Sequence, residues 1–579
     1  MAYLGHSQLI PYQKCDGALP KCSNCERSTG RFSDCEYSGQ GRSEMEHLER
    51  QIAELESRIR ERETSTATER KSVSVFLHDP YLRTSIATQV QSVWAPQRAP
   101  SVCRSAEVPL QLRQSLLSAF IPYANELGFF LDLTEICNTI MTTPSQGTGA
   151  SLVNPALIHV MFLLGSHLST TPQVTVLEPR FLSIAQESVS HILSFTASTM
   201  SGTSGASSHP HWIVLEAIQS HVLLAQYYFL TGRKVEGKYS VTIAIALVLG
   251  TRMHRIRSKE VISRQDQTQM TLGRENRTSG VFLSGSEALQ TQLQEEKEVT
   301  QCINAFWTVL ALNSRWAAVE GYGSSFPYWK PAMRIDTPWP WMNLTPAIRN
   351  SFTIQRFLAS HQDNAHSTLA LYAKACILLE QVFELANRYK RNQSSPDPHP
   401  TLSTPDFLSV LNNLMKLITR FISQLPSISS IQDSPLSNSI SAQASNSGSK
   451  KRELLVIHTL ARVAIIQLYT LFENTSFSSD ERARTNELKV EAANESAKMI
   501  GLVDGRGVTF IDSIMAILWP TIAHVLITEF CRLREMGGRP DPRLADYHKS
   551  FDLIVQAMSG LASSSPLMSE QLKKVQGLS

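Results

Sequence analysis

The sequence predicts an all-α protein with one large helical domain. Between residues 105 and 562 apolar residues recur at intervals of three and four, and almost no stretch shows the polar–apolar alternation of a strand. Of the 579 residues, 42% are hydrophobic and 18% are charged, which is the balance of a globular protein with a sizeable core. Residues 12–38 and 43–63 have a different composition and precede this domain.

The first of these segments, residues 12–38, holds four of the nine cysteines of the chain. Cys15, Cys22, Cys25 and Cys35 are separated by six, two and nine residues. A Cys-x2-Cys pair lets two thiolates reach one Zn²⁺ from a tight turn, and four thiolates complete a tetrahedral site. The spacing therefore predicts a zinc site, against the alternative of four unpaired thiols in a polar tail.

The stretch "KCDGALPKCSNCERSTGRFSDCEY" closely resembles the second part of the fungal binuclear zinc cluster, in which six cysteines hold two zinc ions. The match covers the third to sixth cysteines of that family, the Asp-Gly after the third, the Pro before the fourth and an aromatic residue after the last. The first Cys-x2-Cys pair has no counterpart in "GHSQLIPYQK". One bridging position, Cys22, is kept and the other is missing, so the resemblance implies one zinc ion in this chain and two in the intact family.

The resemblance also implies double-stranded DNA as a partner, contacted here by Lys14 and Lys21. Lysine and arginine side chains bind phosphates and read guanine edges, but the family carries most of them on the helix that is missing here. Residues 1–71 contain 11 Lys/Arg and 12 Asp/Glu, so we expect weak DNA binding. Two explanations stay open: a gene model or splice product truncated at its N-terminus, or a natural variant that no longer reads DNA.

Residues 43–63 carry a short heptad repeat that predicts a dimerising coiled coil. The core positions are Met45, Leu48, Ile52, Leu55 and Ile59. Ile at a with Leu at d favours a parallel pair of helices, and a helix this short is marginal without a partner. We expect a homodimer; the alternative is an amphipathic helix docked on its own chain.

A Ser/Thr- and Pro-containing linker is predicted at 64–104, and the helical domain follows at 105–562. Its helices are expected at 108–126, 153–168, 211–232, 298–321, 366–389, 406–424, 452–474 and 508–536. Polar, Ser-rich or Asn-rich composition predicts flexible insertions near 195–210, 257–297 and 425–451.

Two stretches of this domain resemble the fungal transcription-factor regulatory domain, also called the middle homology region. The first is a helix pair that ends in Leu249, Gly250 and His254. The second begins with Phe-Trp and closes with Ile-Asp-x-Pro-x-Pro, here Phe306, Trp307, Arg315, Ile335, Asp336, Pro338 and Pro340. Each residue also has a structural role: the aromatic pair supplies core area, the glycine can cap a helix, and Arg315 can pair with a carboxylate such as Asp336.

Several other functions find no support in the sequence. The stretch 232–239 approaches a phosphate-binding loop, but Tyr239 replaces the required hydroxyl residue and no strand precedes it. The N-terminus has no secretory pattern, and the apolar runs near 241–250 and 513–528 fall short of the ~20 residues that cross a bilayer. Five scattered cysteines, Cys103, Cys137, Cys302, Cys376 and Cys531, are expected to be small buried side chains. No enzyme motif and no membrane partner are therefore expected.

Together these observations predict a nuclear, zinc-dependent, sequence-specific regulator of RNA polymerase II genes in a fungus, whose helical domain binds coregulators or a small-molecule effector. Two alternatives remain: a regulator without DNA contact that heterodimerises with a full-length zinc-cluster partner, and an all-α enzyme or scaffold.

Overall fold

The computed structural model divides the chain into two units, Met1–Val102 and Cys103–Ser579. In the first unit it describes residues 53, 54 and 57. In the second it describes 108–142, 153–200, 210–256, 285–330, 333–340, 352–361, 363, 365–394, 404–431, 440–473, 478–503, 510–535 and 542–577. The account below concerns this second unit.

The predicted all-α fold is confirmed, because every regular element described is an α-helix or a short 3₁₀ helix. The N-terminal elements are α3 (Leu110–Phe120), η1 (Ile121–Tyr123), α4 (Leu133–Thr142), α5 (Pro155–Leu168), α6 (Pro172–Thr175), α7 (Glu178–Met200), α8 (Pro210–Leu230), α9 (Lys234–Gly250) and η2 (Met253–Arg255). The C-terminal elements are α11 (Gly285–Glu320), α12 (Thr353–Leu358), α13 (Thr368–Ser394), α14 (Thr404–Gln424), η4 (Ile428–Ser430), α15 (Ile440–Glu473), α16 (Ser479–Ile500), α17 (Met515–Glu535), α18 (Pro542–Leu561) and α19 (Pro566–Gln576).

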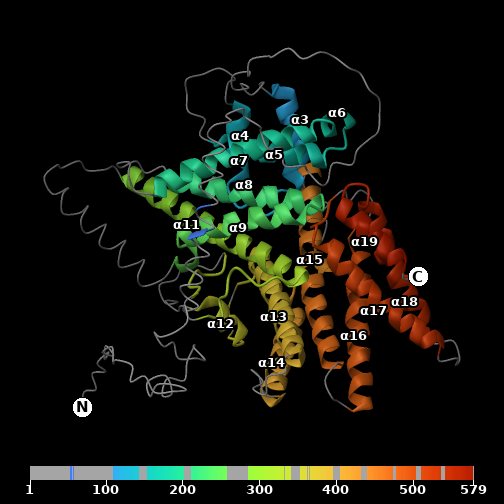
Figure 1. Ribbon diagram of the computed structural model, residues 1–579. Helices are drawn as coiled ribbons and strands as arrows, with labels where there is room; N and C mark the ends of the chain where they lie inside the picture. Colours follow the sequence, from blue (N-terminus) through green and yellow to red (C-terminus); the bar gives the residue numbers. More distant parts are fainter. Residues whose placement is uncertain are drawn as a thin grey trace, which may run out of the picture. The chain divides into compact units, whose positions relative to one another are not determined.

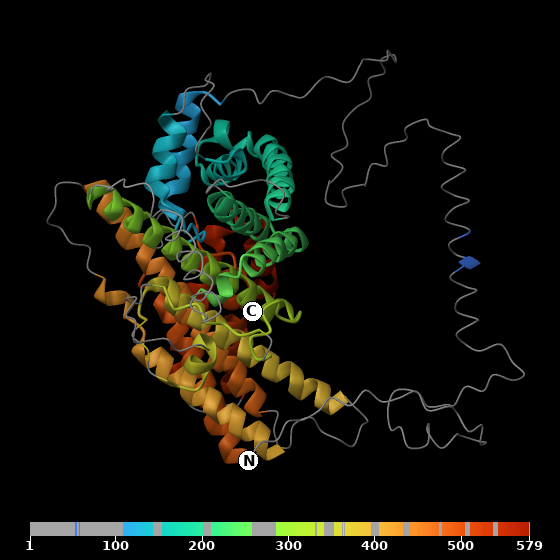
Figure 2. The same cartoon turned by 90° about the vertical axis from the view of Figure 1, so that its left-hand side faces the viewer.

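These helices form two packed groups joined by α11. Helices α5, α7, α8 and α9 lie across the view in Figure 1, whereas α13 to α18 run alongside one another in both views (Figures 1 and 2). Helix α11 packs against α8 and α9 on one side and against α13 on the other. The last helix, α19, contacts α8, α17 and α18, so the helical unit extends beyond residue 562.

Local sequence explains several of the helix ends. The Asn154 side chain accepts a hydrogen bond from the Ala156 amide at the start of α5, where Pro155 is the first helical residue. Ser478 and Glu481 form a reciprocal capping box at the start of α16. Between α8 and α9 the chain turns at Gly232, whose φ of 78° suits a residue without a Cβ.

Three expected insertions contain helix. Helix α7 continues to Met200, α11 begins at Gly285 and α15 begins at Ile440, so each of the insertions predicted near 195–210, 257–297 and 425–451 overlaps the end of a helix. The start of α11, "GSEALQTQLQEEKEV", is polar but rich in Gln, Glu and Leu, which are good helix formers. Polar composition therefore does not exclude helix in such a segment.

Burial corrects two further expectations. Among the scattered cysteines, Cys302 and Cys376 are buried and Cys137 is half-buried, but Cys531 is exposed on α17; Cys103 lies outside the described residues. Three helices are long and apolar enough to cross a membrane by length and composition, namely Trp212–Leu230, Ser447–Glu473 and Met515–Glu535, with 94%, 83% and 39% of the apolar window buried in the protein. The expectation that the last segment is too short counted only uninterrupted apolar residues. Burial within the unit accounts for the apolar character of the first two.

The packing of α3 on α5 predicts that a single methyl group at Gly165 destabilises the fold. A Cβ there would stand 2.3 Å from the Leu116 carbonyl oxygen, and backbone cannot move aside cheaply. We expect Gly165→Ala to lower the free energy of unfolding by about 1–3 kcal/mol, measured by urea titration followed by circular dichroism.

The matched control is Gly560→Ala in α18, where no atom lies within 4 Å of the added Cβ. This change should be neutral or stabilise by up to about 1 kcal/mol, as alanine normally does in a helix. Equal effects of the two substitutions would contradict the close approach of α3 and α5.

Candidate functional site

The residues predicted from the sequence to bind zinc, to bind DNA or to form the dimer all lie outside the described residues. They are Cys15, Cys22, Cys25, Cys35, Lys14, Lys21, Met45, Leu48, Ile52, Leu55 and Ile59. Within the described part of the chain, no group of three or more His, Cys, Asp or Glu side chains is placed to hold a metal ion. The zinc, DNA and coiled-coil assignments therefore stay predictions from sequence.

The two stretches that carry the resemblance to a regulatory domain contact each other. The Asp336 amide donates to the His254 carbonyl at 2.9 Å, and Trp307 Nε1 donates to the Pro338 carbonyl at 2.6 Å. The indole of Trp307 also stacks on Trp339 with centroids 4.1 Å apart. Trp307 is fully buried, which confirms its expected place in the core.

Two details of these stretches were predicted wrongly. Helix α9 ends at Gly250, but its cap is Thr251 and the left-handed residue is Arg252, with φ 59°. The carboxylate of Asp336 pairs with Arg334 at 2.7 Å and accepts the Phe352 amide at 3.0 Å. It is therefore not the partner of Arg315.

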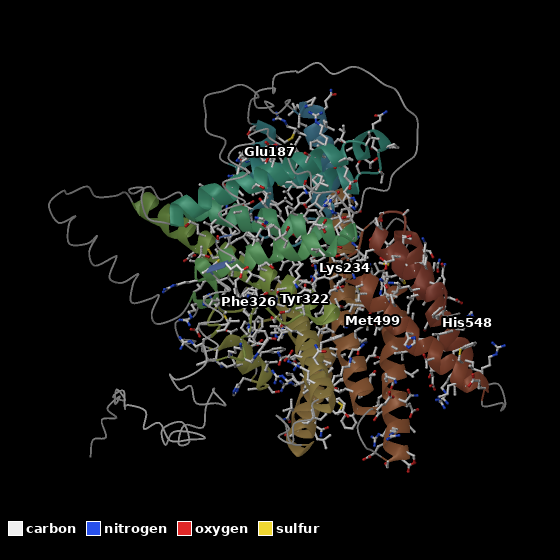
Figure 3. All side chains as sticks on the ribbon, in the orientation of Figure 1. Glu187, Lys234, Tyr322, Phe326, Met499 and His548 are labelled. Atoms are coloured by element: carbon white, nitrogen blue, oxygen red, sulfur yellow. The ribbon has the colours of Figure 1, made fainter. Side chains whose placement is uncertain are left out.

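Neighbouring aromatic side chains extend this core to the end of α11. Phe306 packs edge-on against Phe326, with ring centroids 6.0 Å apart. Phe326 and Tyr322 are labelled in Figure 3, where they lie beside the last turn of α11. The Lys238 ammonium stands 3.7 Å above the Tyr322 ring, so the loop after α11 is fastened to α9.

The partner of Arg315 is Asp512, which lies just before α17. Arg315 has no exposed side-chain surface and the Asp512 side chain is 6% exposed. One guanidinium nitrogen, Nη1, donates to both Asp512 and Tyr372 of α13, and the other, Nη2, donates to Gln226 Oε1 of α8 at 3.0 Å. Tyr372 in turn donates to Asp512 Oδ2 at 2.9 Å. One buried cation thus ties α8, α11, α13 and the chain before α17 together.

A cavity of about 860 Å³ adjoins this network. Tyr372 and Asp512 belong to its wall. The remaining lining comes from the segment after η1, from α11, from the start of α13, from the residues around η4 and from the first half of α15. This volume lies within the range of small-molecule sites in proteins.

The floor of the cavity is formed by a tight turn that follows η1. The Phe130 amide donates to Gln219 Oε1 of α8 at 2.7 Å, and Gln219 Nε2 donates to the Gly128 carbonyl at 3.2 Å. Gly128 has φ 78°, and a Cβ there would stand 2.9 Å from Thr308 Cγ2. Glycine is required by both the backbone angle and the space, and the turn presents Phe129 and Phe130 to the cavity.

A second ion pair borders the cavity. Arg452 Nε lies 3.1 and 3.0 Å from the two carboxylate oxygens of Glu126, and Nη2 lies 2.6 Å from Oε1. Ser449 also donates to Glu126 Oε1 at 3.0 Å. Burial disfavours the charge of Arg452, but these bonds to Glu126 outweigh it and raise the pKa of the guanidinium. The Glu126 carboxylate is therefore fully engaged.

The next residue on α15, Glu453, lines the same cavity without such partners. Among the described residues it has no hydrogen-bond or ion-pair partner. Burial, followed by the negative charge of Glu126, raises the pKa of Glu453 to about 7, against the opposing charges of Arg452 and Lys450. Across the cavity, the Oδ1 atom of Asn304 is buried and accepts no hydrogen bond. The site thus offers two unused acceptors.

The lining has the composition of a small-molecule binding site. The lining contains His366, Ser367 and Ser430, but Ser367 donates to the Pro340 carbonyl at 3.2 Å, and no bond joins His366 to either serine in the described part of the chain. A hydroxyl nucleophile requires an adjacent base. What the lining does provide is aromatic surface, apolar surface and a few convergent polar groups.

No family model, curated protein or solved structure matches this chain.

The hydrogen bonds around Arg315 predict that replacing this residue destabilises the fold much more than breaking an exposed ion pair does. Replacing Arg315 by Met leaves the buried Asp512 carboxylate without its counter-ion, which typically costs about 3–5 kcal/mol. We expect Arg315→Met to lower the free energy of unfolding by that amount in urea titrations. Adding Asp512→Asn to this variant should restore part of the loss, because the unpaired charge is removed.

The control is Lys498→Met, which breaks an exposed pair with Asp546 whose atoms are 2.7 Å apart and whose side chains are 53% and 42% exposed. Its cost should stay below about 1 kcal/mol. If Arg315→Met lowered the free energy of unfolding as little as the control does, the stabilising role assigned to the Arg315 guanidinium would be refuted.

Proposed function

We propose that this chain is a zinc-dependent, sequence-specific DNA-binding regulator of RNA polymerase II genes, of the fungal zinc-cluster class, that works in the nucleus as a dimer. The observation that carries the proposal is the spacing of Cys15, Cys22, Cys25 and Cys35 with its Asp-Gly and Pro residues. A Cys-x2-Cys pair flanked closely by two further cysteines is a spacing typical of zinc sites. The heptad segment that follows supplies the dimer, which in such proteins sets half-site spacing.

In this proposal the helical unit is the regulatory part and receives a small-molecule effector or a coregulator. The support is the 860 Å³ cavity, whose walls come from the segment after η1, from α11, from the start of α13, from the residues around η4 and from α15. A ligand there contacts Tyr372 and Asp512, which belong to the network around Arg315. Binding can therefore change the relative stability of two arrangements of these helices, which is the physical requirement for an effector.

Zinc content tests the proposal directly. The purified full-length chain, kept reduced at neutral pH, should contain about one zinc ion by atomic absorption, because four thiolates complete one tetrahedral site. Cys22→Ser should abolish stoichiometric zinc, since a structural site does not tolerate the loss of a central ligand.

Cys531→Ser is the matched control, because Cys531 is an exposed single cysteine on α17. This variant should keep its zinc. A wild-type chain that takes up neither zinc nor cobalt would remove the basis of the proposal.

The alternative function is a regulator that does not contact DNA itself and instead pairs with a full-length zinc-cluster partner through residues 43–63. The charge of the N-terminal segment favours this alternative. Residues 1–71 carry 11 basic and 12 acidic residues, whereas binding to DNA phosphates relies on an excess of Lys and Arg.

A mobility-shift titration at low and at physiological salt separates the two functions. The DNA-binding reading predicts a sequence-specific complex of the chain alone at low salt that weakens as salt rises, with Lys14→Ala and Lys21→Ala reducing it further. The alternative predicts no specific complex of the chain alone, and loss of the partner's own complex when this chain is added. Glu187→Ala on α7, outside the N-terminal segment, is the control for non-specific effects.

A further inference from the structure

The carboxylates that line the cavity differ in whether a cation pairs with them. Glu126 is neutralised by Arg452, and Asp512 is neutralised by Arg315. Glu453 lies beside the first of these pairs but shares in neither. It is therefore the one cavity-lining carboxylate in the described part of the chain that has no counter-ion in contact.

The remaining charged groups near Glu453 do not supply one. Lys450 is exposed on the same helix and forms no ion pair with Glu453 in the described structure. His366 is also exposed, at the start of α13. An exposed ammonium group keeps its water and contributes little to a partly buried carboxylate.

Two buried or half-buried acceptors of the lining are unused. Asn304 Oδ1 accepts no hydrogen bond, and the Glu453 carboxylate has no partner in contact, whereas the Lys450 ammonium, which also lines the cavity, belongs to an exposed residue. A ligand that satisfies Glu453 and Asn304 Oδ1 must therefore bring donors. Its body must also match the aromatic and apolar lining, which includes Phe129, Phe130 and Leu454.

We propose that the cavity binds an organic cation, a protonated amine on an apolar or aromatic body, with the Glu453 carboxylate as its counter-ion and Asn304 Oδ1 as a second acceptor. The carboxylate and the ammonium group form a charge-assisted hydrogen bond, which is stronger than a neutral one. Phe129 and Phe130 belong to the lining and supply aromatic surface for the body of the ligand. This extends the effector role given above to the helical unit, but it depends on neither zinc nor DNA.

The proposal has a defined pH dependence. An aliphatic amine stays protonated well above neutral pH, so the group that titrates is Glu453. Its pKa of about 7 in the free protein means that protons compete with the cation as the pH falls. Between pH 8 and pH 6 the ionised fraction falls roughly tenfold, and the affinity for the cation should fall with it.

The test uses three fluorescent probes that share one body, added to the full-length chain. Dansylcadaverine is the cation, its N-acetyl derivative is neutral, and 6-(dansylamino)hexanoate is the anion. Fluorescence titration at pH 8 should show the cation binding about tenfold more tightly than the neutral probe, and the anion binding more weakly than both. Lowering the pH to 6 should weaken only the cation.

Two variants of matched charge locate the effect. Glu453→Gln keeps the shape of the side chain and should abolish the preference for the cation and its pH dependence. Glu187→Gln, at an exposed position of α7 that is labelled in Figure 3 and does not line the cavity, should change neither.

A third variant shows whether the probes bind in this cavity of a protein that is still folded. Asn125→Trp places a large ring at an exposed position of the cavity lining and should weaken all three probes together, with circular dichroism unchanged. Equal binding of the three probes, tighter binding of the anion, or a preference that survives Glu453→Gln would overturn the proposal. None of these results would alter the zinc content of the chain, so this failure is distinct from failure of the proposed function.

Discussion

The helical unit is organised around a cation that has no access to water. The Arg315 guanidinium is fully buried, and transferring such a group from water costs several kcal/mol unless every donor finds an acceptor in good geometry. Asp512, Tyr372 and Gln226 accept hydrogen bonds from its two terminal nitrogens, whereas its buried Nε has no partner among the described residues. Because these acceptors must all reach the one Arg315 guanidinium group, the hydrogen bonds fix the positions of α8, α11, α13 and the chain before α17 relative to one another.

This constraint also shapes the cavity. Tyr372 and Asp512 face Arg315 and at the same time line the cavity, so the wall next to the cation cannot collapse inward without breaking its hydrogen bonds. The Glu126 and Arg452 pair holds the opposite side, between the segment after η1 and α15. Protein interiors are otherwise close-packed with few large voids, and these two ion pairs border the open volume.

The sequence alone predicted those features of the molecule that depend on local pattern. The spacing of apolar residues predicted the all-α fold, and Trp307 was placed correctly in the core. The same reasoning assigned Arg315 to Asp336, which is near in sequence, whereas the true partner lies 197 residues away. Periodicity reports which face of a helix is buried but not which helix covers it. Glu453 was invisible for the same reason, since a glutamate beside an arginine and two lysines on α15 has the pattern of a solvated helix turn.

The two proposed activities differ in how much of the chain their chemistry needs. The proposed zinc site needs only four thiolates within residues 15–35, and in so small a module metal binding itself would supply the folding free energy. Its ligands can therefore be nominated from spacing alone. The cavity lining runs from Asn125 to Asp512 and includes residues of α11, α13, α15 and the segment around η4, and no pairwise spacing encodes it. It follows that any change that shifts Arg315 reaches the cavity wall through Tyr372 and Asp512.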